Sequence, residues 1–151
     1  MKDSLRSEAG TYIVILKIVT PQRMEIGKLG NFYFEKGYYL YIGSAHGPGG
    51  IKSRIKRHLK KDKAEHWHID YLRKASSVAA IFFNYSKKKK ECVWASKLSS
   101  SSHLSTPIIG FGSSDCLCPS HLFFGKQPFN IGLLKDIIVE PAELIRFLPH
   151  L

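Results

Sequence analysis

The sequence predicts an α/β (α+β) fold in which a small mixed, mainly antiparallel sheet is flanked by helices. Residues 12–19 and 38–43 are apolar runs rich in β-branched and aromatic side chains, which is typical of buried strands. Stretches with a helical spacing of apolar residues alternate with further strand-like runs, and this alternation favours a mixed architecture. The 151 residues, 44% of them hydrophobic, suffice for one hydrophobic core.

Two short extended segments lie between the two long strands. Residues 24–29 and 32–34 are separated by Gly30 and Asn31, residue types that favour a turn. They predict a hairpin inserted between the long strands. We expect this hairpin at the edge of the sheet.

A helix is predicted to begin near Ile51. A glycine-rich turn at residues 47–50 precedes it, and Ile51, Ile55 and Leu59 recur at every fourth position. The other predicted elements are helices at residues 66–75 and 91–98, strands at 78–83 and 137–139, and a short terminal helix from Pro141 to residue 147.

The charge balance points to a polyanionic partner. Lys and Arg total 23 against 12 acidic residues, which gives a formal net charge of +11. No apolar run approaches the roughly 20 residues of a membrane span, so nucleic acid is expected rather than a membrane. Residues 1–10 lack a secretory pattern, and the three cysteines are too few for a disulfide framework. These observations predict a cytoplasmic location.

Hydrolysis of a phosphodiester needs a cation for the phosphate oxygens, a water that loses a proton, and neutralisation of the leaving oxygen. Arg54 suits the first task because guanidinium binds two phosphate oxygens in a fork. Arg54 and His58 lie one helical turn apart beside the apolar stripe, at its border with solvent. The neighbouring lysines point away, and a solvated basic face is the favoured interpretation for them.

Several motifs occur in a fixed order along the chain. They are Gly-Thr-Tyr at 10–12, Tyr-Ile-Gly-Ser-Ala at 41–45, Gly-Pro-Gly-Gly at 47–50, Arg54 and His58, His-Trp-His-Ile-Asp-Tyr-Leu at 66–72, Glu91-Cys92, Gly-Ser-Ser-Asp-Cys-Leu-Cys at 112–118 and Ser-His-Leu at 120–122. In this order they resemble the GIY-YIG nuclease superfamily. More narrowly, they are similar to its mainly archaeal Uri-type endonuclease branch, a domain of unknown function also found fused to endonuclease III-like glycosylases.

This resemblance implies a GIY-YIG-like domain at residues 10–124, with an N-terminal extension at 1–9 and a C-terminal extension at 125–151 packed on it. It also implies a metal-dependent endonuclease that cuts DNA and acts in DNA repair, with a repair glycosylase as a partner by analogy. RNA is the alternative substrate. Many relatives carry an asparagine downstream of the metal-binding glutamate, and here Ser113, Ser114 or Asp115 are the candidates to replace its hydrogen bonds.

Glu91 is the candidate ligand for the divalent metal ion, Mg²⁺ or Mn²⁺. It is the only acidic residue in a basic stretch, and such ions prefer carboxylate oxygen together with several waters. The alternative is structural, because the helix dipole alone favours an acidic residue in a first turn.

The resemblance casts Tyr12 and Tyr41 as the tyrosines that line the scissile phosphate. We expect them to face one another, with Tyr12 activating the water and Tyr41 orienting water or phosphate. Satisfied, buried tyrosines are the alternative. The resemblance also implies a catalytic histidine at His68, with Asp70 orienting its ring, against the alternative that the ring caps the next helix.

Further residues are expected to contact nucleic acid. The glycine-rich turn before the basic helix either binds phosphate at a helix N-terminus or is a plain turn. The full expected set is Gly43, Ser44, Lys52, Lys56, Arg57, Lys60, Lys61, Ser113 and Ser114.

Cys92, Cys116, Cys118 and His121 include the ligand types of a Cys₃His zinc site. The Cys-x-Cys spacing differs from the usual Cys-x-x-Cys pair, so packing of the thiols is favoured over structural Zn²⁺.

Two rival functions remain. One is a noncatalytic nucleic-acid-binding module with a degenerate nuclease site, in which Arg54 and the lysines only neutralise phosphates. The other is a scaffold that uses an apolar surface in residues 131–151.

Overall fold

The computed structural model describes residues 4–114, 116–126 and 131–148, and it confirms the predicted fold class. Its main feature is a five-stranded antiparallel sheet in the order β6-β4-β1-β5-β7. The strands of this sheet are β1 (Gly10–Ile18), β4 (Gly37–Ala45), β5 (Ser77–Tyr85), β6 (Leu122–Gly125) and β7 (Glu143–Arg146). The helices are α1 (Gly50–Leu59), α2 (His68–Lys74), α3 (Glu91–Ser99) and α4 (Ile131–Ile138).

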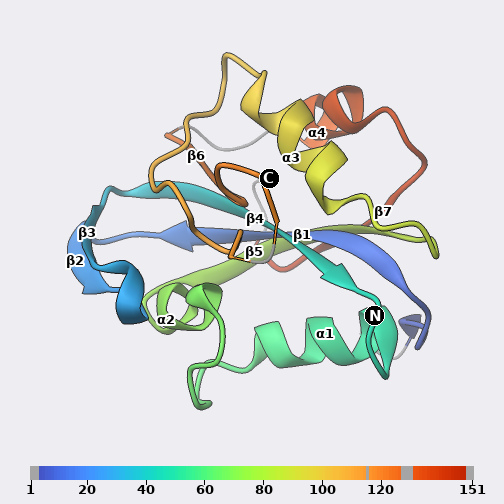
Figure 1. Ribbon diagram of the computed structural model, residues 1–151, viewed down its shortest axis with the longest axis horizontal. Helices are drawn as coiled ribbons and strands as arrows, with labels where there is room; N and C mark the ends of the chain where they lie inside the picture. Colours follow the sequence, from blue (N-terminus) through green and yellow to red (C-terminus); the bar gives the residue numbers. More distant parts are fainter. Residues whose placement is uncertain (1–3, 115, 127–130, 149–151) are drawn as a thin grey trace.

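Helices cover both faces of the sheet (Figure 1). One face packs against α1 and α2, and the opposite face packs against α3 and α4. The side chains of β1 alternate between these layers, because successive residues of a strand point to opposite faces. Tyr12 and Val14 belong to the core on the α1 side, whereas Ile13 and Ile15 belong to the core on the α3 side.

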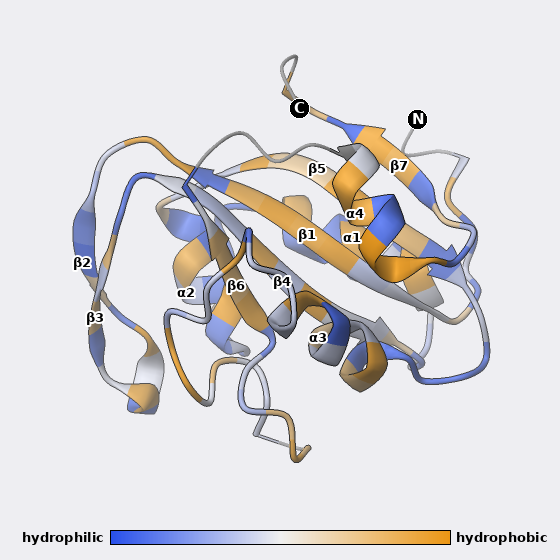
Figure 2. Ribbon diagram, turned by 90° about the horizontal axis from the view of Figure 1, so that it is seen from above, coloured by the Kyte–Doolittle hydropathy of each residue, from blue (hydrophilic) through white to orange (hydrophobic). Residues whose placement is uncertain are grey.

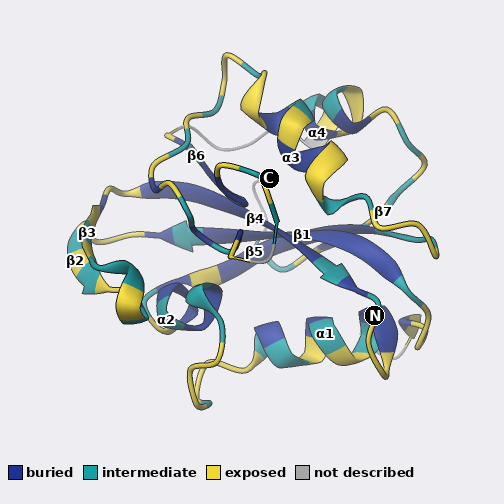
Figure 3. Cartoon of the chain, viewed as in Figure 1, coloured by how far each residue is buried: buried dark blue, intermediate teal, exposed yellow. Residues whose placement is uncertain are grey.

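The two predicted long strands lie side by side at the centre of the sheet. All residues of β1 except Lys17 are buried, and β4 is buried over nearly its whole length (Figure 3). A strand covered on both faces reads as a continuous apolar run, which explains why these two elements were predictable.

The predicted hairpin is present, but its expected place at the edge of the main sheet is wrong. β2 (Gln22–Glu25) and β3 (Asn31–Phe34) pair with each other and form a separate two-stranded sheet, joined by the short 3-10 helix η2 (Gly27–Leu29). The hairpin projects beyond the end of the main sheet (Figure 2). Ile26 and Phe34 anchor it in the core on the α1 side, so burial rather than strand pairing fixes its position.

The C-terminal prediction is also wrong. The predicted strand at 137–139 belongs largely to α4, because Leu134 and Ile138, four residues apart, are both buried on one helix face. The predicted helix at 141–147 is instead β7, which pairs with β5. Residues 143–146 therefore form an edge strand of the main sheet. None of the helices in the described ranges combines the length and apolar character that a membrane span requires.

Candidate active site

A cavity of about 170 Å³ opens beside the end of β4, between α1 and the start of α3. Gly112, Cys116 and His121 close it on a further side. Its lining combines a cation, a carboxylate, a phenol and an indole with thiol and imidazole groups. The lining residues are Tyr41, Gly43, Ser44, Arg54, Trp67, Glu91, Gly112, Cys116 and His121.

The two tyrosines lie on one face of the sheet but are not directly opposite each other, which corrects the expectation that they face one another. Tyr12 pairs with Gly43, and Val14 pairs with Tyr41. The Tyr12 ring crosses Gly43 so closely that a Cβ there would lie 2.2 Å from the Tyr12 hydroxyl. Glycine is required at this position because any side chain would displace the phenol.

Tyr12 lies behind the cavity wall and is hydrogen-bonded to His58. The Tyr12 hydroxyl and His58 Nε2 are 2.7 Å apart, and both residues are almost fully buried. Burial raises the pKa of Tyr12 and outweighs the Arg54 guanidinium, which lowers it. Burial also lowers the pKa of His58 to about 3, so its ring is neutral near pH 7.

Tyr41 is the phenol that lines the cavity itself. Burial raises its pKa well above the ordinary value, and neighbouring Tyr12 adds to that rise while Arg54 opposes it. Both tyrosines are therefore protonated phenols near neutral pH, able to donate a hydrogen bond to a phosphate or water.

Arg54 reaches the cavity over the face of Trp67. The guanidinium carbon lies 4.5 Å from the centre of the indole ring, and Arg57 stacks on the same ring at 4.5 Å. Such stacking fixes the plane of a guanidinium while leaving its N–H groups available. Sequence reasoning missed this role of Trp67, although the indole stands between two histidines in the quoted motif.

Asp70 is a structural anchor and does not orient His68 as expected. Its Oδ2 accepts hydrogen bonds from the backbone N–H groups of His66 and Trp67, at 2.8 and 2.9 Å, and from Arg57 Nη2 at 2.6 Å. Burial raises the pKa of Asp70, but these hydrogen bonds outweigh it and the pKa is lowered overall. Arg57 therefore uses this nitrogen for an ion pair within the fold.

His68 holds one wall of the cavity in place without lining it. The backbone N–H of Gly112 donates to His68 Nδ1 at 2.9 Å. Gly112 has a φ of +68°, and a Cβ there would lie 2.7 Å from Tyr41 Cε1. His68 and this glycine thus press the loop against Tyr41. Burial lowers the pKa of His68, which keeps its ring a neutral acceptor.

Glu91 begins α3 and lines the cavity together with Arg54 and Tyr41. The backbone N–H of the preceding residue, Lys90, donates to Thr11 Oγ1 at 3.3 Å and ties the start of the helix to β1. Among the described residues, no ion pair occupies the Glu91 carboxylate. It is available as a ligand.

The N–H groups of α1 that follow the glycine-rich turn already have acceptors within the protein. The backbone N–H of Ile51 donates to the Glu8 carbonyl at 2.9 Å, and that of Lys52 donates to the Arg6 carbonyl at 3.2 Å. The N-terminal segment therefore caps α1, which supports a structural interpretation of the turn.

The other residues expected to bind nucleic acid occupy varied positions. Lys56, Lys60 and Lys61 are exposed and Lys52 is partly exposed, as a solvated basic face requires. The remaining members differ. Ser44 lines the cavity and its hydroxyl is 2.5 Å from His46 Nδ1, Ser113 is buried, Ser114 is exposed, and Asp115 lies outside the described residues.

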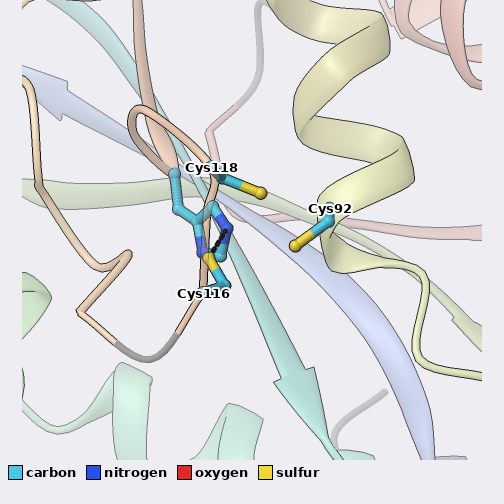
Figure 4. Close-up of side chains that lie close together, drawn as sticks. Cys92, Cys116 and Cys118 are labelled. Carbon is cyan, nitrogen blue, oxygen red and sulfur yellow. Dashed lines mark hydrogen bonds between the residues drawn. The ribbon is translucent and has the colours of Figure 1, made fainter.

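The three cysteines and His121 converge, which the spacing alone did not predict. One ligand atom from each of Cys92, Cys116, Cys118 and His121 lies within 4.8 Å of all the others, so this group could hold a metal ion. Figure 4 shows the thiols of Cys92, on α3, and Cys118, on the loop, pointing toward each other. We call this group the Cys₃His cluster.

The fold and the cavity together define a small α+β domain that presents an arginine and a carboxylate to a shared cavity. The chain belongs to the family described as Domain of unknown function DUF123, whose family model matches residues 11–139. Comparisons with curated proteins and with solved structures find no significant match.

Proposed function

We propose that this chain is a metal-dependent endonuclease that hydrolyses phosphodiester bonds of DNA. The observation that carries the proposal is the shared cavity lined by Tyr41, Arg54 and Glu91. A guanidinium and a carboxylate that can hold a cation, both lining one cavity, match the negative charge of a phosphate bound there. The resemblance to the GIY-YIG superfamily, Uri-type branch, supports the same assignment and suggests a role in DNA repair.

The residues fit a hard divalent cation such as Mg²⁺ or Mn²⁺. Glu91 offers a carboxylate that forms no ion pair with another described residue, and the cavity of about 170 Å³ leaves room for several waters, each of which occupies about 30 Å³. When bound, the ion would polarise the phosphate and lower the pKa of a bound water. Arg54 would hold two phosphate oxygens in its fork, with Trp67 keeping the guanidinium in plane.

The two phenols take different roles in this proposal. Tyr41 donates its hydrogen bond to the phosphate or the water from the cavity wall. Tyr12 is assigned to water activation. Its hydrogen bond to His58 orients the hydroxyl, and the Arg54 guanidinium, which lowers the pKa of this phenol, would stabilise the phenolate. His68 acts through Gly112 and is a positioning residue.

A noncatalytic nucleic-acid-binding module is the second candidate. The observation that favours it is the burial of Tyr12, whose hydroxyl lies behind Gly43 and whose pKa is raised. A general base with such a pKa is a poor one near neutral pH. In this alternative Arg54 and the exposed lysines of α1 neutralise phosphates, and binding weakens as salt rises.

A nicking assay separates the two candidates. Supercoiled, branched and lesion-containing DNA and a matched RNA are incubated with the parent chain and Mg²⁺ or Mn²⁺, beside Glu91→Gln and Arg54→Lys. We expect cleavage by the parent and a loss of at least about 100-fold in both variants, because each removes a group that meets the transition-state charge.

Glu65→Gln and Lys36→Gln are the matched controls, since both parent residues are exposed outside the cavity lining. They should cut like the parent, and circular dichroism checks that every variant is folded. DNA binding by all chains without cleavage under either metal supports the module. Cleavage that survives in Glu91→Gln at the parent rate rejects the proposed site.

A further inference from the structure

The Cys₃His cluster has the spacing of a metal site before any ion is considered. Its four ligand atoms lie within 4.8 Å of one another, and Cys116 Sγ is 3.4 Å from His121 Nε2. With Zn–S bonds of about 2.3 Å and a Zn–N bond of about 2.0 Å, the ligand atoms of a tetrahedral site are about 3.5 to 3.8 Å apart. Small side-chain rotations would bring the remaining groups to that separation.

The local conformation explains how a Cys-x-Cys pair can supply two ligands. Leu117, between the two cysteines, is fully exposed, whereas Cys116 and Cys118 are both partly buried and belong to the cluster. Residues 116 and 117 lie in a bend, in which both thiols join the cluster while the leucine side chain is turned to solvent. An exposed leucine has no packing role here, and its exposure follows from turning both thiols inward.

The imidazole of His121 is held for ligation. Its ring is buried, and Nε2 lies 3.4 Å from Cys116 Sγ. Burial therefore holds the ring with this nitrogen directed at the cluster.

We propose that Cys92, Cys116, Cys118 and His121 bind one Zn²⁺ in a tetrahedral Cys₃His site that fastens the first turn of α3 to the segments carrying the other three ligands. Three thiolates and an imidazole form a soft donor set that selects zinc over Mg²⁺ or Mn²⁺. All four coordination positions are filled by side chains, so the site is structural and has no open position for a substrate.

The position of the cluster gives it a second consequence, which rests on the proposed nuclease function. Cys92 directly follows Glu91, and Cys116 and His121 line the same cavity as Glu91. A zinc ion held by these residues therefore fixes where the Glu91 carboxylate points. Zinc acts here as a positioning device for the ligand of the second, catalytic metal ion.

The zinc site is tested first without reference to activity. Metal content of the purified chain is measured by mass spectrometry, and the zinc-stripped chain is titrated with Zn²⁺ against a chromophoric chelator and with Co²⁺. We expect about one zinc per chain and, with Co²⁺, thiolate charge-transfer and tetrahedral d–d absorption bands. A stripped chain that takes up no zinc, or Co²⁺ spectra without thiolate bands, overturns the proposal.

Four ligand variants and one control locate the ion. Cys92→Ser, Cys116→Ser, Cys118→Ser and His121→Asn should each weaken Zn²⁺ binding by more than about 100-fold, beyond the 10- to 100-fold loss typical of changes behind the ligands. His103→Asn, which alters an exposed histidine outside the cluster, should keep one zinc at parental affinity. Full zinc content in all four ligand variants overturns the assignment. Because the stripped parent is also measured, variants that fail to fold do not decide the outcome.

The positioning role is measured separately through the catalytic metal. If it holds, the zinc-stripped but folded chain needs a higher Mg²⁺ concentration for half-maximal cleavage, and returning Zn²⁺ restores the parental value. An unchanged Mg²⁺ requirement rejects the positioning role. If the chain binds zinc but never cuts DNA, the zinc site is supported and the nuclease function is rejected. If it cuts DNA without binding zinc, the nuclease function is supported and the zinc site is rejected.

Discussion

The two sides of the cavity are held in place in different ways. On the side we call the cation side, Arg54 stacks on Trp67, and Asp70 accepts hydrogen bonds of 2.6, 2.8 and 2.9 Å at the start of α2. On the carboxylate side, Glu91 lies beside the Cys₃His cluster, where Cys116 Sγ is 3.4 Å from His121 Nε2 and 3.8 Å from the Ser113 carbonyl. Charge-assisted hydrogen bonds fix the first side, whereas thiols make only weak ones on the second.

The weaker hydrogen bonding of the carboxylate side does not extend along the whole of α3. Trp94 Nε1 donates to Glu140 at 2.9 Å, and Lys97 Nζ donates to the Ile138 carbonyl at 2.7 Å, so the later turns of this helix are well anchored. The first turn, which carries Glu91 and Cys92, is joined to β1 by the hydrogen bond from the Lys90 N–H to Thr11 Oγ1, and Cys92 also belongs to the cluster. The comparison teaches that hydrogen bonds within the protein hold the cation side, while the carboxylate side has a donor set that a metal ion would complete.

The largest effect is expected from removing the buried anchor of the cation side. Asp70→Ala should lower the free energy of unfolding by about 3 kcal/mol, because it leaves Arg57 and two backbone N–H groups without their acceptor. Asp70→Asn should lower the free energy of unfolding by less, since its amide oxygen can still accept hydrogen bonds from the backbone N–H groups. Urea denaturation monitored by tryptophan fluorescence measures both changes.

Glu65→Ala is the matched control for the Asp70 variants. Glu65 also pairs with a cation, Lys74, but this pair is more exposed, and screening by solvent makes it weak. Its removal should leave the urea midpoint almost unchanged. Equal losses in Asp70→Ala and Glu65→Ala would show that Asp70 does not anchor the cation side.

Acid should weaken the core behind the cavity through His58. Its pKa is about 3 in the folded chain and about 6.5 when unfolded, so the unfolded state takes up a proton first as pH falls. The contribution of neutral His58 to the free energy of unfolding is therefore complete above about pH 6.5. It is lost as pH falls toward 3, by up to about 1.4 kcal/mol per pH unit. Unfolding free energies measured from pH 7 to pH 4 test this.

His58→Gln separates this contribution from other acid effects. The amide can still accept a hydrogen bond from Tyr12 but does not titrate, so the slope between pH 6.5 and pH 4 should flatten. The Asp70 carboxyl, whose pKa is lowered below its ordinary acidic value, affects the free energy of unfolding at lower pH. His103→Gln at an exposed position should keep the parental slope. An unchanged slope in His58→Gln contradicts the assignment.

The central fold was predictable because its signals are local. A continuous apolar run identifies β1, and the spacing of Ile51 and Ile55 identifies α1. The tail was not predictable, because α4 and β7 acquire their roles by packing on partners distant in sequence, such as β5. The position of the β2–β3 hairpin was not predictable for the same reason, because it is set by packing of Ile26 and Phe34 in the core on the α1 side.

The candidate site likewise contains residues that the sequence identified and contacts that it could not reveal. The motif positions identified Arg54, Tyr41 and Glu91, which the structure brings to one cavity. Neither the stacking of Trp67 nor the convergence of the Cys₃His cluster could be derived from spacing, because both depend on contacts between separate elements. The role of Asp70 was misassigned for the same reason: its partner Arg57 lies 13 residues earlier.

The smallest effect is expected at Gly112, the residue that joins the two sides. Gly112→Ala should lower the free energy of unfolding by about 1 to 2 kcal/mol, the cost of a left-handed backbone for a residue with a Cβ. Because that Cβ would lie 2.7 Å from Tyr41 Cε1, cleavage should fall as the phenol moves. Gly47→Ala is the control, since nothing lies within 4 Å of its Cβ position. Equal urea midpoints for the two variants would mean that the loop yields freely, and Gly112 would then not hold Tyr41 against the cavity.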